Sequence, residues 1–328
     1  MLFRSTEHER LALAALWLLD AVLQYQTFMF SQGFPRMLAA TAAGNPAGVA
    51  GPVTWSAHLI GTHPGAANAA FATLQLLLAL GIAWRPTTRA ALAASVAWAL
   101  AVWWLGEGLG GVLTGAASPV TGAPGAALLY ALAAVLLWPT PASLPGRDRA
   151  APFAAAVAVG APVARALWLM LWGGMAWLTV VASRGPGLVP GEVLAGGMPT
   201  GDPRWLQSLG ASASALVTRH AGPVGLVTAC LFACIAAGVY LPVPAARVTL
   251  CVAVLAALAM WAAGQDLGGL FTRATTDPDS APLLVLLAAA YWPVRGGARH
   301  GSAADHSQTL DPARAGGFTE PRPLAGVR

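Results

Sequence analysis

Residues 103–114 read WWLGEGLGGVLT, and residues 261–272 read WAAGQDLGGLFT. Two tryptophan-led, glycine-rich stretches lie 158 positions apart, which indicates an internal repeat, and a repeat determines the fold of a whole chain. With this offset, nine of the 22 positions in residues 103–124 are identical to those in residues 261–282. Pro124 falls on Pro282 in this alignment. We therefore expect a duplicated unit.

The composition indicates a membrane protein. Hydrophobic residues make up 57% of the chain and charged residues 9%, whereas a soluble domain carries about 25% charged residues. A helix needs about 20 apolar residues to cross a bilayer. The chain has eight apolar runs, at residues 11–30, 66–84, 90–105, 126–138, 163–182, 224–241, 248–263 and 282–294. These runs predict an all-α polytopic membrane protein with eight transmembrane helices, arranged as two tandem four-helix repeats in parallel orientation.

The arginines predict the topology of the chain. We divide it into a first repeat (1–139), a cytoplasmic linker (140–162), a second repeat (163–294) and a disordered cytoplasmic tail (295–328), which is polar and rich in Gly, Pro and Arg. All 18 basic residues are arginine, and thirteen fall on the side of both termini. This bias places both termini in the cytoplasm. We expect a multi-pass protein of a bacterial plasma membrane, in contact with lipid, and no nucleic-acid partner.

The segments after the first run of each repeat are long, at about residues 31–65 and 183–222. They hold Trp55 and Trp205, and tryptophan is enriched at the interface between membrane and water. We expect these segments to face outward and to lie in the interface as short helices.

Three polar side chains inside the apolar runs are candidates for a binding site. Asp20 lies near the middle of the first run, where a charge costs about 3 kcal/mol. Gln24 follows one helical turn later, and Gln75 on the second run could reach both. The aligned positions of the second repeat hold Met175 and Phe232. This asymmetry favours a site in the first repeat; the alternative is an Asp20 that only fixes helix packing.

The glycine-rich stretch has two interpretations. Gly106 and Gly110 could form a small-xxx-small helix contact followed by a tight turn. Alternatively, irregular backbone could line a cavity, because the run at 126–138 spans only about 20 Å of a core about 30 Å thick. Glu107 stands where the second repeat has Gln265. The predicted ligand-binding residues are Asp20, Gln24, Gln75 and Glu107.

Metal and thiol chemistry have little support in the sequence. His58 and His63 are five positions apart, which is not the i, i+4 spacing of a helical metal pair. Cys230 and Cys234 share a helical face and Cys251 lies on the next run, but buried thiols within apolar helices usually act as small hydrophobic side chains. We predict no metal site and assign no catalytic residue, and whether the chain is an enzyme stays open.

Residues 68–92 read NAAFATLQLLLALGIAWRPTTRAAL. This segment resembles the second helix of the DoxX/DoxD-like membrane proteins, in which a polar residue precedes a glycine-bearing, Leu-rich helix that ends in an arginine pair. Gln75, Gly81, Arg85 and Arg89 match that pattern, and the chain would be two such four-helix units fused. Family members often carry glutamate at the position of Gln75. The resemblance implies an association with redox proteins, membrane or peripheral, and with quinone.

Three functions follow as hypotheses. The first is a membrane subunit that supports a redox partner and binds quinone or another lipid-like ligand between its helices. The second is a non-catalytic scaffold for other membrane proteins. The third is a small-solute or proton-coupled transporter with Asp20 and Glu107 on the transport path. The apolar runs hold few polar residues for such a path. We rank them in this order.

Overall fold

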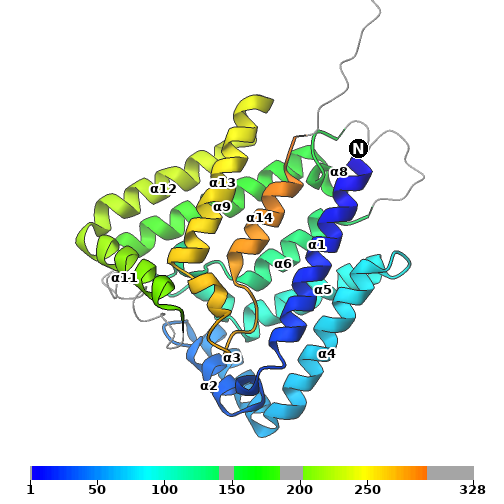
Figure 1. Cartoon of the computed structure of the whole chain (residues 1–328), viewed down its shortest axis with the longest axis vertical. Coiled ribbons are helices and arrows are strands. Elements are labelled where there is room, and N and C mark those ends of the chain that lie inside the picture. Colours follow the sequence, from blue (N-terminus) through cyan, green and yellow to red (C-terminus); the bar gives the residue numbers. More distant parts are fainter. Residues whose placement is uncertain (1, 140–150, 185–201, 294–328) are drawn as a thin grey trace, which may run out of the picture. The chain divides into compact units, whose positions relative to one another are not determined.

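The computed structural model describes residues 2–139, 151–184 and 202–293, and within these ranges the regular structure is helical (Figure 1). The described residues belong to one compact unit, residues 1–294. Residues 140–150 of the predicted linker and the predicted disordered tail lie outside the described residues. We call residues 2–139 the first half of the molecule and residues 151–293 the second half.

Each of the eight apolar runs corresponds to a helix. Five helices are long and apolar enough to cross a membrane: α4 (Pro64–Ala83), α5 (Thr88–Leu105), α9 (Ala161–Arg184), α12 (Ala221–Gly238) and α13 (Val243–Ala263). The other three are α1 (Leu2–Leu23), α6 (Ala126–Leu136) and α14 (Ser280–Ala290). With 11 residues each, α6 and α14 extend about 16 Å. The fold is therefore compatible with an integral membrane protein, and the predicted count of eight spans is not confirmed.

The first helix differs from its prediction. The apolar run predicts it over residues 11–30, but α1 begins at Leu2 and ends at Leu23. The polar N-terminal residues extend the helix beyond the apolar run, since Glu and Arg are good helix formers. At the other end, the Asn68 side chain donates a hydrogen bond to the Gln24 carbonyl (2.6 Å). Asp20 therefore lies in the last turn of α1, not in the middle of a span.

Short helices occupy the segments between the long ones. After α1 come η1 (Thr27–Phe30), α2 (Gly33–Ala40) and α3 (Ala47–Thr62), and after α9 comes α11 (Arg204–Arg219). Trp55 on α3 and Trp205 on α11 are both exposed. The expectation of helices in these segments is thus met in their described part, outside which residues 185–201 lie. That the segments face outward and lie in the interface stays a prediction.

The helices pack in corresponding pairs in the two halves. In the first half α1 packs on α4 and α5 on α6; in the second, α9 packs on α12 and α13 on α14. The short helices α6 and α14 pack against each other, so they form the junction between the halves (Figure 1). Both are buried on nearly every side. The helix α8 (Ala155–Val159) packs against α6 and α9.

The two glycine-rich stretches have the same backbone shape. Each forms a 3-10 turn, η2 (Gly108–Gly111) and η4 (Asp266–Gly269), with a left-handed Leu-Gly pair inside. The φ angles are 58° and 60° at Leu109 and Gly110, and 54° and 69° at the corresponding pair. A Cβ at Gly110 would overlap the Pro124 carbonyl, so only glycine fits this position.

These turns correct two details of the sequence analysis. Because α5 ends at Leu105, Gly106 and Gly110 lie beyond the helix and do not form a small-xxx-small helix contact. The tryptophan that opens each stretch donates its indole N–H to a proline carbonyl, Trp103 to Pro124 (2.7 Å) and Trp261 to Pro278 (2.9 Å). Pro124 therefore corresponds in space to Pro278, not to Pro282. The second segment is four residues shorter, since α6 and α14 begin 154 positions apart and not 158.

Candidate functional site

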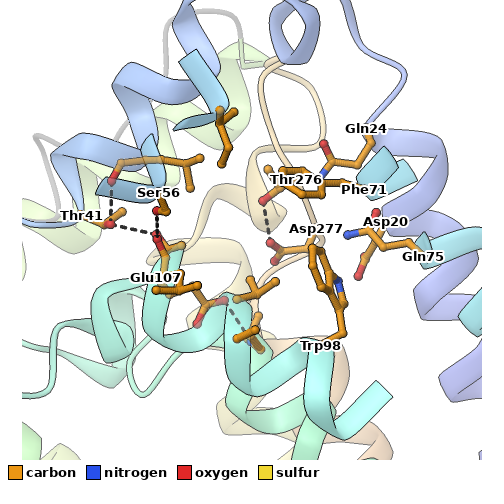
Figure 2. A pocket seen from close by; sticks show the side chains of 18 of the residues that line it. Asp20, Gln24, Thr41, Ser56, Phe71, Gln75, Trp98, Glu107, Thr276 and Asp277 are labelled. Carbon is orange, nitrogen blue, oxygen red and sulfur yellow. Dashed lines mark hydrogen bonds between the residues drawn. The ribbon is translucent and has the colours of Figure 1, made fainter. Parts of the chain in front are cut away.

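The first half encloses a cavity of about 410 Å³. Helices α1 to α6 supply most of its walls, together with the turn after α5. All four predicted ligand-binding residues line this one cavity: Asp20, Gln24, Gln75 and Glu107. Figure 2 shows them around a common space, with Asp20, Gln24 and Gln75 on one side and Glu107 on the other. That they bind a ligand stays a prediction.

The polar groups from α1 and α4 are buried without partners. Asp20 is 2% exposed, Gln24 4% and Gln75 7%. One side-chain oxygen of each, Asp20 Oδ1, Gln24 Oε1 and Gln75 Oε1, has no hydrogen-bond partner. The Tyr130 hydroxyl of α6 lies beside the Asp20 carboxyl, outside full hydrogen-bond geometry. Buried polar groups are normally paired, so these oxygens are available to a bound molecule.

Glu107 lies at the start of the glycine-rich turn and contacts the N-terminus of α6. Its Oε1 accepts a hydrogen bond from the Ala127 N–H (3.0 Å), and a carboxylate is favourable at this end of a helix. Its Oε2 is buried without a partner. Burial foremost, and the neighbouring Asp277 carboxyl next, raise the pKa of Glu107 to about 8. Glu107 is therefore both a helix cap and an ionisable group of the cavity.

Aromatic side chains form the apolar wall of the cavity. Phe71 packs against Trp98 (5.3 Å between ring centroids) and against Phe34 (6.4 Å), and Trp17 packs against Tyr130 (4.2 Å). Around these rings the walls are mostly aliphatic. The combination of a large apolar surface and a few convergent polar groups is typical of a small-molecule site.

Two hydroxyl groups attach α2 and α3 to the end of α5. Thr41 Oγ1 donates to the Gly106 carbonyl (2.8 Å), and Ser56 Oγ donates to the Leu105 carbonyl (2.7 Å), as Figure 2 shows. These bonds satisfy carbonyls that the end of α5 leaves without intrahelical partners. On this side the lining includes Trp55 and Leu59, which are 60% and 55% exposed, so the cavity opens next to α3.

The second half contributes one further acid that sequence reasoning missed. Thr276 and Asp277, in the segment before α14, line the cavity of the first half. The Asp277 carboxylate accepts hydrogen bonds from Thr276 Oγ1 (2.7 Å) and from the Asp279 N–H (2.8 Å). Burial raises the pKa of Asp277. Burial, and next the neighbouring Asp277 carboxyl, raise the pKa of Asp279 to about 7. An alignment compares each position of one half with the matched position of the other, so it does not show that Asp277 of the second half contacts the cavity of the first.

The reverse contact is also present. Ser118, Val120 and Thr121 of the first half line a much smaller cavity, about 50 Å³, among α9, α11 and α12 of the second half. Each half therefore contributes the segment before its short helix, α6 or α14, to a cavity of the other half.

The matched interior of the second half is filled. Met175 and Phe232 stand where the first half has Asp20 and Gln75, and both are 1% exposed. Trp172 packs against Phe232 (5.6 Å) and Trp168 (5.7 Å). Gln265, at the position of Glu107, donates its amide to Ser280 Oγ (2.9 Å) at the start of α14.

The histidines and cysteines form no metal-binding cluster in the described part of the chain. No group of three or more His, Cys, Asp or Glu side chains there could hold a metal ion. Cys230, Cys234 and Cys251 are free and exposed, whereas the sequence analysis predicts buried thiols. They lie on outward faces of α12 and α13, where a thiol still acts as a small apolar side chain.

Comparison with protein-family models, with curated proteins and with solved structures gives no match. The resemblance to the DoxX/DoxD-like proteins therefore stays a prediction, and the site is interpreted from its own geometry.

Proposed function

We propose that this chain is an integral membrane protein that binds one amphipathic, lipid-like molecule in the cavity of its first half. The observation that carries the proposal is a cavity of about 410 Å³ in which unpartnered oxygens of Asp20, Gln24, Gln75 and Glu107 converge between aromatic walls. Its volume falls in the range of about 300–1,000 Å³ that is usual for sites of small organic ligands.

The polarity of the walls supports an amphipathic ligand. An apolar molecule would leave the buried carboxyl and amide groups unpaired, which costs free energy, and a fully polar molecule would be desolvated by the aromatic wall. A ligand with a polar end and an apolar body satisfies both. Access next to α3, at Trp55 and Leu59, suits a molecule that arrives from the membrane or its interface.

A quinone is the ligand of this class that the family resemblance implies. We extend the proposal to a DoxX-type association with a redox partner and to a duplicated four-helix unit with both termini in the cytoplasm. The matching backbone of η2 and η4 and the matching helix pairs support the duplication.

The test is a calorimetric titration of the protein in phosphatidylcholine nanodiscs with a decyl-substituted benzoquinone. We expect saturable binding with one molecule per chain. Gln75→Phe should abolish it, because the larger ring fills the cavity. The matched control is Leu77→Phe on the same helix, which points outward (59% exposed) and should bind as the wild type does. Equal binding by both variants would contradict the cavity as the site, and absence of saturable binding would exclude quinone.

A further inference from the structure

We propose that the ligand of this cavity carries a positive charge at its polar end, as an organic ammonium ion does. This inference rests on the proposed function and specifies the chemistry of the ligand. It depends on three features of the cavity: its acids, its lack of basic side chains, and its aromatic wall.

The acids reach the cavity from three elements. Asp20 comes from the end of α1, Glu107 from the turn after α5, and Asp277 from the segment before α14. Asp279 lies behind Asp277, and the Tyr130 hydroxyl faces Asp20 from α6. These are the titratable groups around the space; helices α2, α3 and α4 add none to the lining. Three carboxyl groups thus surround one cavity.

No basic side chain balances these acids among the described residues that line the cavity. The unpartnered polar atoms around the cavity are oxygens of Asp20, Gln24, Gln75 and Glu107, together with the Trp98 indole N–H and the Tyr130 hydroxyl. Buried acids without a cation must take up protons, because an isolated charge at low dielectric is very costly. A bound cation can replace those protons and leave the carboxylates ionised and paired.

The aromatic wall is also suited to a cation. Trp17, Phe71 and Trp98 line the same space as the carboxyl groups, and Figure 2 labels Phe71 and Trp98 around the same cavity as Asp20, Gln75 and Asp277. The faces of such rings attract a cation, and the attraction is stronger when the pair is removed from water. Aromatic cages are a known arrangement for binding quaternary ammonium groups.

The alternatives fit these features less well. A small metal ion would leave the apolar walls unfilled, and no group of three metal-ligating side chains is present in the described part of the chain. A neutral quinone could accept hydrogen bonds here but would leave the three carboxyl groups without a cation. An anion would meet three carboxyl groups.

The test compares two probes of the same shape. Benzyltrimethylammonium carries a fixed positive charge, and neopentylbenzene is its neutral carbon isostere. Both are titrated into the protein in a maltoside detergent, which carries no charge and no ammonium group. We expect the ammonium to bind at least tenfold more tightly. Asp20→Asn should weaken the ammonium at least tenfold and leave the isostere unchanged, whereas Asp266→Asn, at a buried acid away from the cavity, should leave both unchanged.

A pH series on the wild type keeps the test independent of any variant. The probe does not titrate, so its affinity should rise more than tenfold from pH 6 to pH 8 as the carboxyl groups release protons. Tighter or equal binding of the neutral isostere, or a flat pH profile, would overturn the cationic ligand and leave the proposed function standing. Failure of both probes and of the quinone would overturn both proposals.

Discussion

The two halves of the molecule carry the same glycine-rich turn at the same place, yet among the described residues the large cavity lies beside the turn of the first half and the second half has a cavity of about 50 Å³. In the first half Asp20 and Gln75 face an open space of about 410 Å³; in the second, Met175 and Phe232 fill the matched interior with Trp172. The residue before each turn also differs, since Glu107 caps α6 with a carboxylate oxygen and Gln265 donates its amide to Ser280. The backbone thus frames the interior of each half, and the side chains decide whether it is open or packed.

The largest effect is expected where the halves are alike. Gly110→Ala and Gly268→Ala should each destabilise the protein by about 3 kcal/mol or more, because a Cβ combines left-handed strain with overlap of a backbone carbonyl. Thermal unfolding in mild detergent measures the loss. Gly115→Ala is the control, since its φ is also positive (76°) but the space around it is open; strain alone should cost about 1 kcal/mol. A harmless Gly268→Ala would show that the two turns are not equivalent.

The next prediction exchanges the residues that distinguish the halves. Phe232→Gln should cost about 3 kcal/mol, because it removes a buried ring and buries an amide in its place. The reverse change, Gln75→Phe, should leave the stability within about 1 kcal/mol of the wild type, since the ring enters an existing cavity. Denaturant or thermal unfolding of the two variants decides the point. Similar losses in both would mean that the first half is as tightly packed as the second.

The acids make the stability of the first half depend on pH. Glu107 has a folded pKa of about 8, above its ordinary value of 4.5, so the folded state holds a proton that the unfolded chain has lost. The contribution of Glu107 to the free energy of unfolding should therefore be greatest below pH 4.5 and should fall as the pH rises to about 8. Asp279, with a pKa of about 7, adds to the fall. Melting temperatures from pH 5 to pH 8 should decline by a few degrees in the wild type and less in Glu107→Gln. An equal decline in both would rule out Glu107 as the source.

The smallest effect concerns the attachment of α2 and α3. Thr41→Val and Ser56→Ala each remove a hydroxyl bond to the end of α5 and should each cost about 1 kcal/mol. Thr54→Val is the matched control, because its exposed hydroxyl bonds only within α3 and its loss should cost no more than about 0.5 kcal/mol. Thermal unfolding of the three variants measures these losses of stability. A loss for Thr54→Val as large as for the other two would contradict a stabilising role of the bonds to α5.

Much of the helix content and of the site composition could be predicted from the sequence. The eight apolar runs all form helices, because long apolar segments without strand-like alternation have few other stable forms. Asp20, Gln24, Gln75 and Glu107 stand out in the sequence as polar groups in apolar surroundings, and they line one cavity. Burying a polar group among apolar residues is costly, so a polar residue within an apolar run is by itself a signal of a site.

Three features could not be predicted, for physical reasons. α1 ends at Leu23, where the Gln24 carbonyl accepts a hydrogen bond from Asn68, 44 positions away, and such a distant contact is not visible in a local pattern. The contribution of Asp277 depends on how the halves pack, which a comparison of one half with the other does not contain. The exposure of Cys230 and its neighbours on α12 depends on which helix face packs inward, and a helix that is apolar all round does not reveal it.

The most direct test of the central claim is native mass spectrometry of the protein released from a mild detergent, with identification of any molecule that stays bound. We predict one small amphipathic molecule per chain in the wild type and none in Gln75→Phe, with Leu77→Phe as the control that retains it. Two bound molecules per chain, or equal occupancy in wild type and Gln75→Phe, would contradict the claim that the first half alone provides the site.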